Sequence, residues 1–191
     1  DDEQPIREHL GVCHDICHSA VMFEPQQQAI EQYRAAGIRV GKVQISAAVR
    51  APFDQMSPQH ATEALGQLRN FSEPKYLHQT TIRNDEGQLQ MFEDLGDALK
   101  RFGDTPPGQA CRVHFHVPIN VATFGRLEST QDQITPCLRT LFADDETRHF
   151  EVETYAWSVL PRSMQHEQLA EGIAQELAWL DNWLKQHEAA E

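Results

Sequence analysis

Short strand-like runs alternate with amphipathic helical runs along this chain, and that alternation limits the folds open to it. Runs typical of β-strands lie near residues 11–17, 40–46, 111–117 and 150–157. Segments typical of helices lie at 26–37, 58–71, 93–102, 129–142 and 164–187. This order predicts an α/β fold with parallel strands and with helices that cover the sheet.

Local signals predict where several elements begin and end. Gly37 follows the first helical run as a C-terminal cap, and Ser57 with Pro58 marks the start of the next helix. The residues at 84–87, Asn-Asp-Glu-Gly, predict the turn of a β-hairpin. About four β–α units with this hairpin inserted correspond to half of an eight-stranded (β/α)8 barrel, or to a small open sheet. A half barrel exposes strand edges, so we expect missing upstream residues, a pairing with a second copy, or another segment that closes the sheet.

Bulk composition excludes several classes of function. The chain has 191 residues and a net charge of −13, which fits one domain over 1–191 and argues against binding to nucleic acid or anionic membranes. No apolar stretch approaches the roughly 20 residues that cross a bilayer, and no signal segment precedes the first strand. The four cysteines do not form a disulfide framework. We therefore expect a cytoplasmic protein with reduced thiols.

The predicted strands are unusual because one face of each is polar. Side chains alternate along a strand with period two, so Val43, Val113 and Phe115 belong to an outward apolar face. The interleaved inward residues are Cys13, Asp15, Cys17, Lys42, Gln44, Ser46, Arg112, His114, His116, Glu151, Glu153 and Tyr155. We expect a lower layer in which Lys42, Arg112 and Glu151 neutralise one another, because buried charges are tolerated when they are paired.

The layer above would bring ligand-type groups together near the carboxyl ends of the strands, where barrel enzymes place their chemistry. It contains Asp15, Gln44, His114 and Glu153, with Ser46, His116 and Tyr155 nearest the mouth. A register slip of two residues would place His116 beside Glu153. The predicted metal ligands are therefore Asp15, His114, His116, Glu153 and Gln44, and this mixture of nitrogen and oxygen suits Zn, Mn, Fe or Co.

Other polar residues have candidate roles in catalysis or substrate binding. His18 follows Asp15 by three residues and can face the same mouth, as a second ligand, as a group that orients substrate, or as a catalytic group that handles a proton. Glu153 is the candidate for proton transfer, and His78 and Tyr155 are candidates for substrate contacts. The alternatives are structural: Asp15 as a helix cap, the histidines as hydrogen-bonded interior or surface groups, and the cysteines as small packing residues.

Five segments together resemble a known group of proteins. They are HLGVCHDICHSAVMFE, GIRVGKVQISAA, YLHQT, RVHFHVPI and EVETYAWSVLP. In this order they resemble the xylose isomerase-like TIM barrels, and most nearly the metabolite traffic protein EboE family. The resemblance implies a barrel whose N-terminal half lies outside this chain, and a divalent-metal pocket that includes Asp15, His18, His116 and Glu153. Gln44 stands where related epimerases and endonucleases commonly have histidine.

Four hypotheses of function follow. The first is a metal-dependent isomerase or epimerase that acts on a sugar, a polyol or another small metabolite. The second is a non-catalytic protein that binds or hands on a metabolite in the same pocket. The third is an endonuclease IV-like phosphodiester hydrolase, which the net charge and the missing histidine disfavour. The fourth is a degenerate structural half barrel that pairs with another chain.

Overall fold

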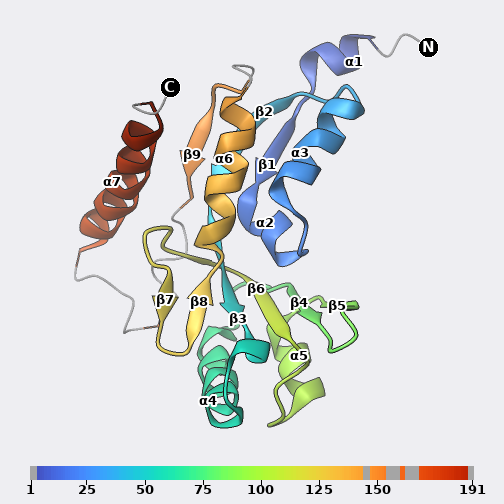
Figure 1. Ribbon diagram of the computed structural model, residues 1–191, viewed down its shortest axis with the longest axis vertical. Coiled ribbons are helices and arrows are strands. Elements are labelled where there is room, and N and C mark those ends of the chain that lie inside the picture. Colours follow the sequence, from blue (N-terminus) through green and yellow to red (C-terminus); the bar gives the residue numbers. More distant parts are fainter. Residues whose placement is uncertain (1–3, 144–146, 154–159, 162–167, 189–191) are drawn as a thin grey trace.

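Two β-sheets form the framework of the protein, and they meet along one continuous chain segment, 40–51 (Figure 1). The computed structural model describes residues 4–143, 147–153, 160–161 and 168–188. A parallel sheet has the strand order β1-β2-β9, in which β1 is Val12–Asp15, β2 is Val40–Ile45 and β9 is Phe150–Val152. These three strands confirm the expected parallel arrangement over part of the chain.

The second sheet has the strand order β5-β4-β6-β3-β8-β7, and all of its paired strands are antiparallel. Its strands are β3 Ala47–Ala51, β4 Thr80–Arg83, β5 Leu89–Phe92, β6 Ala110–Val117, β7 Thr123–Phe124 and β8 Leu127–Ser129. Only Ser46 separates β2 from β3, so the chain passes directly from one sheet into the other.

The predicted half of a TIM barrel is therefore wrong. A barrel requires β6 to run parallel to the earlier strands, but β6 pairs antiparallel with both β3 and β4, with Arg50 opposite Arg112 and Thr81 opposite Arg112. The error has a physical cause, because the period-two alternation of side chains is the same in parallel and antiparallel strands. The strand at 111–117 is confirmed, whereas its direction could not be read from its pattern.

Seven helices are described, together with three short 3₁₀ turns. The helices are α1 Gln4–His9, α2 Ile16–Val21, α3 Gln26–Ala35, α4 Pro58–Leu68, α5 Leu95–Phe102, α6 Ile134–Phe142 and α7 Leu169–Glu188. The 3₁₀ turns are η1 Phe53–Gln55, η2 Arg69–Phe71 and η3 Gln131–Gln133. Helices α2, α3 and α6 lie beside the parallel sheet, whereas α4 and α5 lie against the antiparallel sheet (Figure 1). None of the helices in these ranges has the length and apolar character that a membrane span requires.

The local sequence signals are largely confirmed. Gly37 adopts a φ of 67° after α3, and Gly87 adopts a φ of 79° in the turn between β4 and β5. These are left-handed conformations that glycine adopts without steric cost. In α7, Leu169 and Leu177 are exposed, whereas Trp179 and Trp183 pack against the core.

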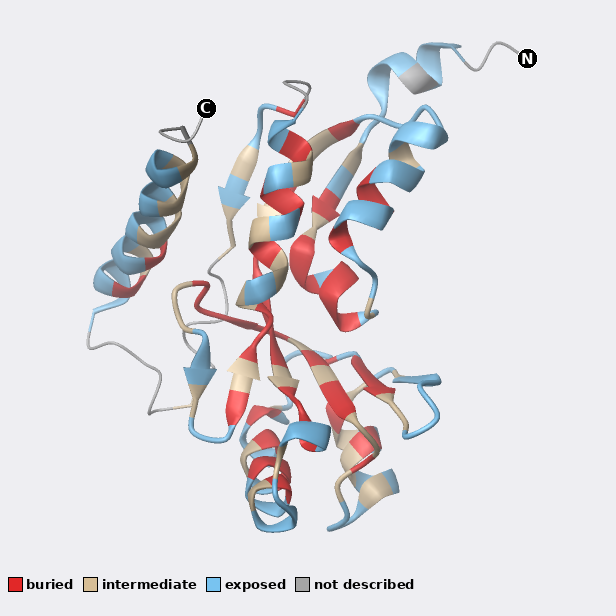
Figure 2. Cartoon of the chain, viewed as in Figure 1, coloured by how far each residue is buried: buried red, intermediate tan, exposed pale blue. Residues whose placement is uncertain are grey.

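One apolar core runs through both sheets. It includes Val43 and Ile45 of β2, Val49 of β3, and Val113 and Phe115 of β6, all at most 1% exposed. Figure 2 shows buried residues concentrated where the two sheets meet and on the inner sides of α2, α4 and α6. Polar groups near this junction are therefore held by a well-packed framework.

The N-cap of α4 gives a first test of this description. Ser57 Oγ accepts a hydrogen bond from the His60 N–H at 3.3 Å. We expect Ser57→Ala to lower the free energy of unfolding by about 1 kcal/mol, because it leaves an N–H group at the helix end without its protein partner. Urea denaturation measures this change. The exposed Gln32→Ala in α3 is the matched control and should shift stability by less than about 0.5 kcal/mol.

Candidate metal centre at the junction of the two sheets

The carboxyl ends of the parallel strands meet one face of β6. Asp15 is the last residue of β1, Gln44 lies near the end of β2, and Glu153 directly follows β9. His114 and His116 share the face of β6 that turns toward α2. Ligand sites in α/β sheets commonly lie at the carboxyl ends of parallel strands. Here the antiparallel sheet supplies the histidines that complete such an edge.

Asp15 both caps a helix and contributes to the cluster. Its Oδ1 accepts hydrogen bonds from Cys17 N–H at 2.9 Å and from Ser46 Oγ at 2.7 Å. Its Oδ2 lies 3.7 Å from His18 Nε2. The cap role is therefore confirmed. It also fixes the carboxylate in a position where the second oxygen faces an imidazole.

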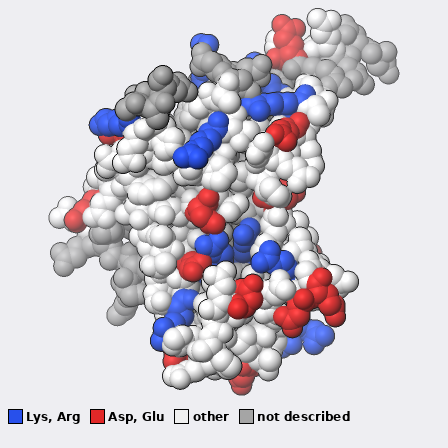
Figure 3. Space-filling view, in the orientation of Figure 1, with Lys and Arg blue, Asp and Glu red and all other residues white. Residues whose placement is uncertain are grey.

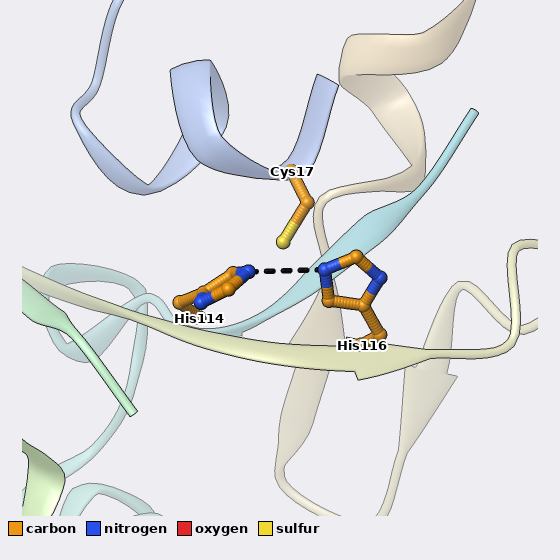
Figure 4. Close-up of side chains that lie close together, drawn as sticks. All are labelled: Cys17, His114 and His116. Atoms are coloured by element: carbon orange, nitrogen blue, oxygen red, sulfur yellow. Dashed lines mark hydrogen bonds between the residues drawn. The ribbon is translucent and has the colours of Figure 1, made fainter. Parts of the chain in front are cut away.

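His114 and His116 make a direct contact through their imidazole nitrogens. Their Nε2 atoms are 3.0 Å apart (Figure 4). Burial and the neighbouring His18 and His116 lower the pKa of His114 to about 3, although Asp15 acts in the opposite direction. Burial also lowers the pKa of His116 to about 4, with Asp15 raising it and His18 lowering it. Both rings are neutral at pH 7, so the Nε2–H of one ring donates a hydrogen bond to the Nε2 of the other.

This nitrogen pair also suits a shared cation. Zinc binds histidine nitrogen at about 2.0–2.1 Å in tetrahedral geometry, which places two ligand nitrogens about 3.3 Å apart. The observed 3.0 Å between the two Nε2 atoms is close to that spacing. Neutral imidazole is the form that binds metal ions. The two neutral rings therefore fit a shared divalent ion once the ring that carries its proton on Nε2 holds it on Nδ1 instead.

Cys17 joins this pair, although we predicted it to be a packing residue. It is fully buried in the first turn of α2, and its side chain points toward the two histidines (Figure 4). Burial, with Asp15 and Glu153 adding to it, raises the pKa of the Cys17 thiol well above its usual range. The signal in the sequence was Asp15 as an N-cap, because a helix starting at Ile16 turns Cys17 back over β6.

Two overlapping groups of donors result. Cys17, His114 and His116 form one group, and Asp15, His18 and His116 form the other, with the ligand atoms of each group within 4.8 Å of one another. The first group is largely buried, whereas the His18 side chain in the second is 53% exposed. Structural zinc sites are closed, and catalytic sites keep a position open. The second group has the accessibility of a catalytic site.

Glu153 lies beside this second group. Gln44 Nε2 donates to Glu153 Oε2 at 2.8 Å, and His116 Nδ1 lies 3.6 Å from the same oxygen. Cys13 Sγ donates to Gln44 Oε1 at 3.3 Å, so the amide positions the carboxyl group. His116 and Glu153 lie close together although β6 and β9 belong to different sheets, so no strand register relates them. Burial raises the pKa of Glu153 to about 7, with Asp15 and Glu151 adding to the effect and Lys42 opposing it.

The remaining predicted residues lie elsewhere. Lys42 and Glu151 form an ion pair at the surface, and Arg112 is not part of it, so the expected buried charge layer is absent among the described residues. The His78 ring packs on Phe115, on the opposite side of β6 from His114 and His116. Its nitrogens contact Glu73 Oε1 at 3.0 Å and the His114 carbonyl at 3.1 Å. Tyr155, expected at the mouth, lies outside the described residues.

An open pocket of about 370 Å³ adjoins the cluster. Asp15, His18 and Gln44 line it, together with Glu24 and Tyr33. The part of the chain that the structure describes contributes no lysine or arginine to its lining. An acidic pocket of this kind favours a neutral or cationic ligand over an anionic one.

The raised pKa of Glu153 predicts how stability depends on pH. Because the pKa rises from 4.5 to about 7 on folding, the native protein holds a proton that the unfolded chain releases between these values. Native stability therefore falls as pH increases through this window. We expect Glu153→Gln to gain stability relative to the wild type over the same window. Chemical denaturation in the presence of a chelator, at about pH 5 and about pH 8, measures the free energy of unfolding of Glu153→Gln relative to the wild type. If this relative stability stays constant or falls between the two pH values, the raised pKa of Glu153 is contradicted.

Comparisons with known proteins do not add a family to these observations. No family model matches the chain, and no curated protein or solved structure matches it at a significant level.

Proposed function

We propose that Asp15, His18 and His116 hold one divalent cation, and that the protein uses it to isomerise or epimerise a small hydroxyl- or carbonyl-bearing metabolite. The observation that carries this proposal is the position of the three donor atoms. They lie within 4.8 Å of one another and adjoin an open pocket of about 370 Å³. A cation bound there would polarise the oxygens of a ligand.

The chain's own residues supply the other requirements. Ser46 and the first turn of α2 fix Asp15 through three hydrogen bonds, so its carboxylate is positioned before any ligand binds. Gln44 holds the Glu153 carboxyl group beside His116. A carboxyl group with a pKa of about 7 can accept and return a proton near neutral pH. In this proposal Glu153 moves the proton, and Asp15, His18 and His116 bind the metal.

The resemblance to xylose isomerase-like proteins supports the same class of reaction. The support comes from the Asp15-x-x-His18 element and from His116 and Glu153, and it does not depend on a barrel. The donor set of nitrogen and oxygen suits Zn, Mn, Fe or Co. The acidic lining of the pocket favours a neutral polyol or sugar as the metabolite.

Hydrogen exchange tests the proposal. Metal-loaded protein is incubated in D₂O with a panel of aldoses, ketoses and hydroxyketones, and deuterium is measured at the carbon next to the carbonyl group. We expect exchange with at least one compound, and we expect Glu153→Gln to reduce it by about 100-fold or more while the metal content is unchanged. Glu151→Gln, two residues away, is the control and should keep the activity. Exchange that survives Glu153→Gln would show that this carboxyl group is not the base.

A further inference from the structure

Three arginines share one face of the antiparallel sheet. Arg50 of β3 and Thr81 of β4 each lie directly opposite Arg112 of β6, and Arg83 lies two residues beyond Thr81 on the same face. Like charges directly opposite one another on a sheet destabilise it unless another group compensates them. Figure 3 shows Lys and Arg side chains gathered at the waist of the molecule, beneath the helices of the parallel sheet.

Only one of these three arginines is neutralised within the described residues. Arg50 pairs with Glu128 at 2.7 Å and with Asp132 at 2.9 Å. Arg83 and Arg112 form no ion pair in the described ranges. Their guanidinium groups lie 5.1 Å and 4.1 Å from the centre of the Phe23 ring. Two adjacent positive charges that no carboxylate of the described segments pairs with are notable in a chain with 29 acidic and 16 basic residues.

Most hydrogen-bond donors of this pair have no partner among the described residues. Arg112 Nη1 donates to the Ala20 carbonyl at 2.6 Å, which caps the end of α2. The Nε atoms of Arg83 and Arg112 are both buried, and neither has a hydrogen-bond partner in the part of the chain that the structure describes. Each guanidinium carries five N–H donors in a planar fork that matches carboxylate and phosphate groups. Capping α2 explains one contact of Arg112 and does not explain Arg83.

The surroundings of the pair support an anionic ligand. The positive charges of Arg50, Arg83 and Arg112 repel one another, because the three side chains share one face of the sheet. A bound anion would offset this repulsion. On the neighbouring strand, Leu89 lies opposite Arg83 and is 50% exposed, and Met91 lies opposite Thr81 and is 58% exposed. Exposed apolar side chains therefore adjoin the positive charges.

We infer that Arg83 and Arg112 bind the oxyanion group of a small molecule, a phosphate or a carboxylate, whose apolar portion lies over Leu89 and Met91. Charge complementarity selects this occupant, because the only uncompensated positive groups on this face lie next to its exposed apolar side chains among the described residues. The site is separate from the metal ligands and does not depend on the proposed function.

The test uses three probes: inorganic phosphate, hexyl phosphate and hexanoate. Each is titrated into ¹⁵N-labelled protein with a chelator present, and the arginine Nε–Hε resonances are followed by NMR. We expect saturable shifts of two of these resonances. Arg83→Gln should weaken binding by about tenfold or more, because it removes a charged bidentate donor. The Arg83 side chain makes no hydrogen bond within the described chain, so this variant should fold. Arg126→Gln, at an exposed arginine paired with Glu63, is the control.

The probes also distinguish the parts of the inference. Hexyl phosphate should bind more tightly than inorganic phosphate, and Leu89→Gln should remove that advantage without changing the affinity for inorganic phosphate. A preference for hexyl phosphate over hexanoate assigns a phosphate ligand, and the reverse assigns a carboxylate. Absence of saturable shifts with all three probes would overturn the site, as would unchanged affinity in Arg83→Gln. Equal binding of the two phosphates would overturn the apolar portion.

Asp15→Asn should bind every probe as the wild type does, so failure of the metal proposal leaves this result unaffected.

Discussion

Replacing His116 with alanine should remove the bound divalent ion. His116 belongs to both groups of donors, so its loss leaves two protein ligands in each. Loss of a group that only supports a metal ligand typically weakens binding 10–100-fold, and the loss of a ligand itself should exceed about 100-fold. Elemental analysis of the purified protein after dialysis against a weak chelator measures the change. The expected result is about one ion per wild-type chain and almost none in His116→Ala.

Two further variants separate the two donor groups. Asp15→Asn weakens only the open group, and Cys17→Ala removes a donor only from the buried group. We expect Asp15→Asn to lose most of the ion and Cys17→Ala to keep it. The opposite pattern would place the ion in the closed group and would favour a structural role. Full metal content in His116→Ala, with the fold confirmed by circular dichroism, would defeat the assignment of a metal centre to this junction.

Replacing Phe115 with alanine should strongly lower the free energy of unfolding. Phe115 is 1% exposed, and its ring contacts Phe71 at 5.0 Å and His78 at 4.8 Å between centroids. Truncation of a buried phenylalanine costs about 3–5 kcal/mol, because it removes apolar burial and leaves a cavity. Guanidinium denaturation measures the change in the free energy of unfolding.

The expected loss is large beside the usual stability of a domain, which is about 5–15 kcal/mol. Leu177→Ala in α7 is the control, because Leu177 is 51% exposed and its truncation should shift stability by no more than about 0.5 kcal/mol. Equal effects of the two substitutions would contradict the burial that the structure assigns to β6.

Sequence reasoning located most elements but not their arrangement. The Ser57 cap, Gly37 and the hairpin turn at 84–87 are local signals, and all three are confirmed. The direction of β6 is not a local property. It depends on pairing with β3 and β4, which are remote from β6 in the sequence. A correct alternation pattern was therefore compatible with a wrong barrel.

The candidate site was also predictable only in part, where local signals place its residues. Asp15, Gln44 and Glu153 lie at or near the carboxyl ends of strands that run parallel, so the strand order brings them to one edge. Cys17 was misjudged because β1 ends at Asp15, and the residues after it follow a helical period. Arg112 was expected in a charge layer with Lys42, but its antiparallel neighbours place it against α2 instead. Membership of the xylose isomerase-like group stays a prediction.

The short passage from β2 to β3 has a mechanical consequence. Asp15 and His18 belong to the parallel unit, whereas His116 belongs to the antiparallel one, and Ser46 lies at the crossing and bonds to Asp15. A cation bound by these side chains would cross-link the parallel and the antiparallel sheet, which the chain already joins at Ser46. Occupancy of the junction should therefore stiffen the whole molecule, and hydrogen exchange should slow in β2, β3 and β6 together.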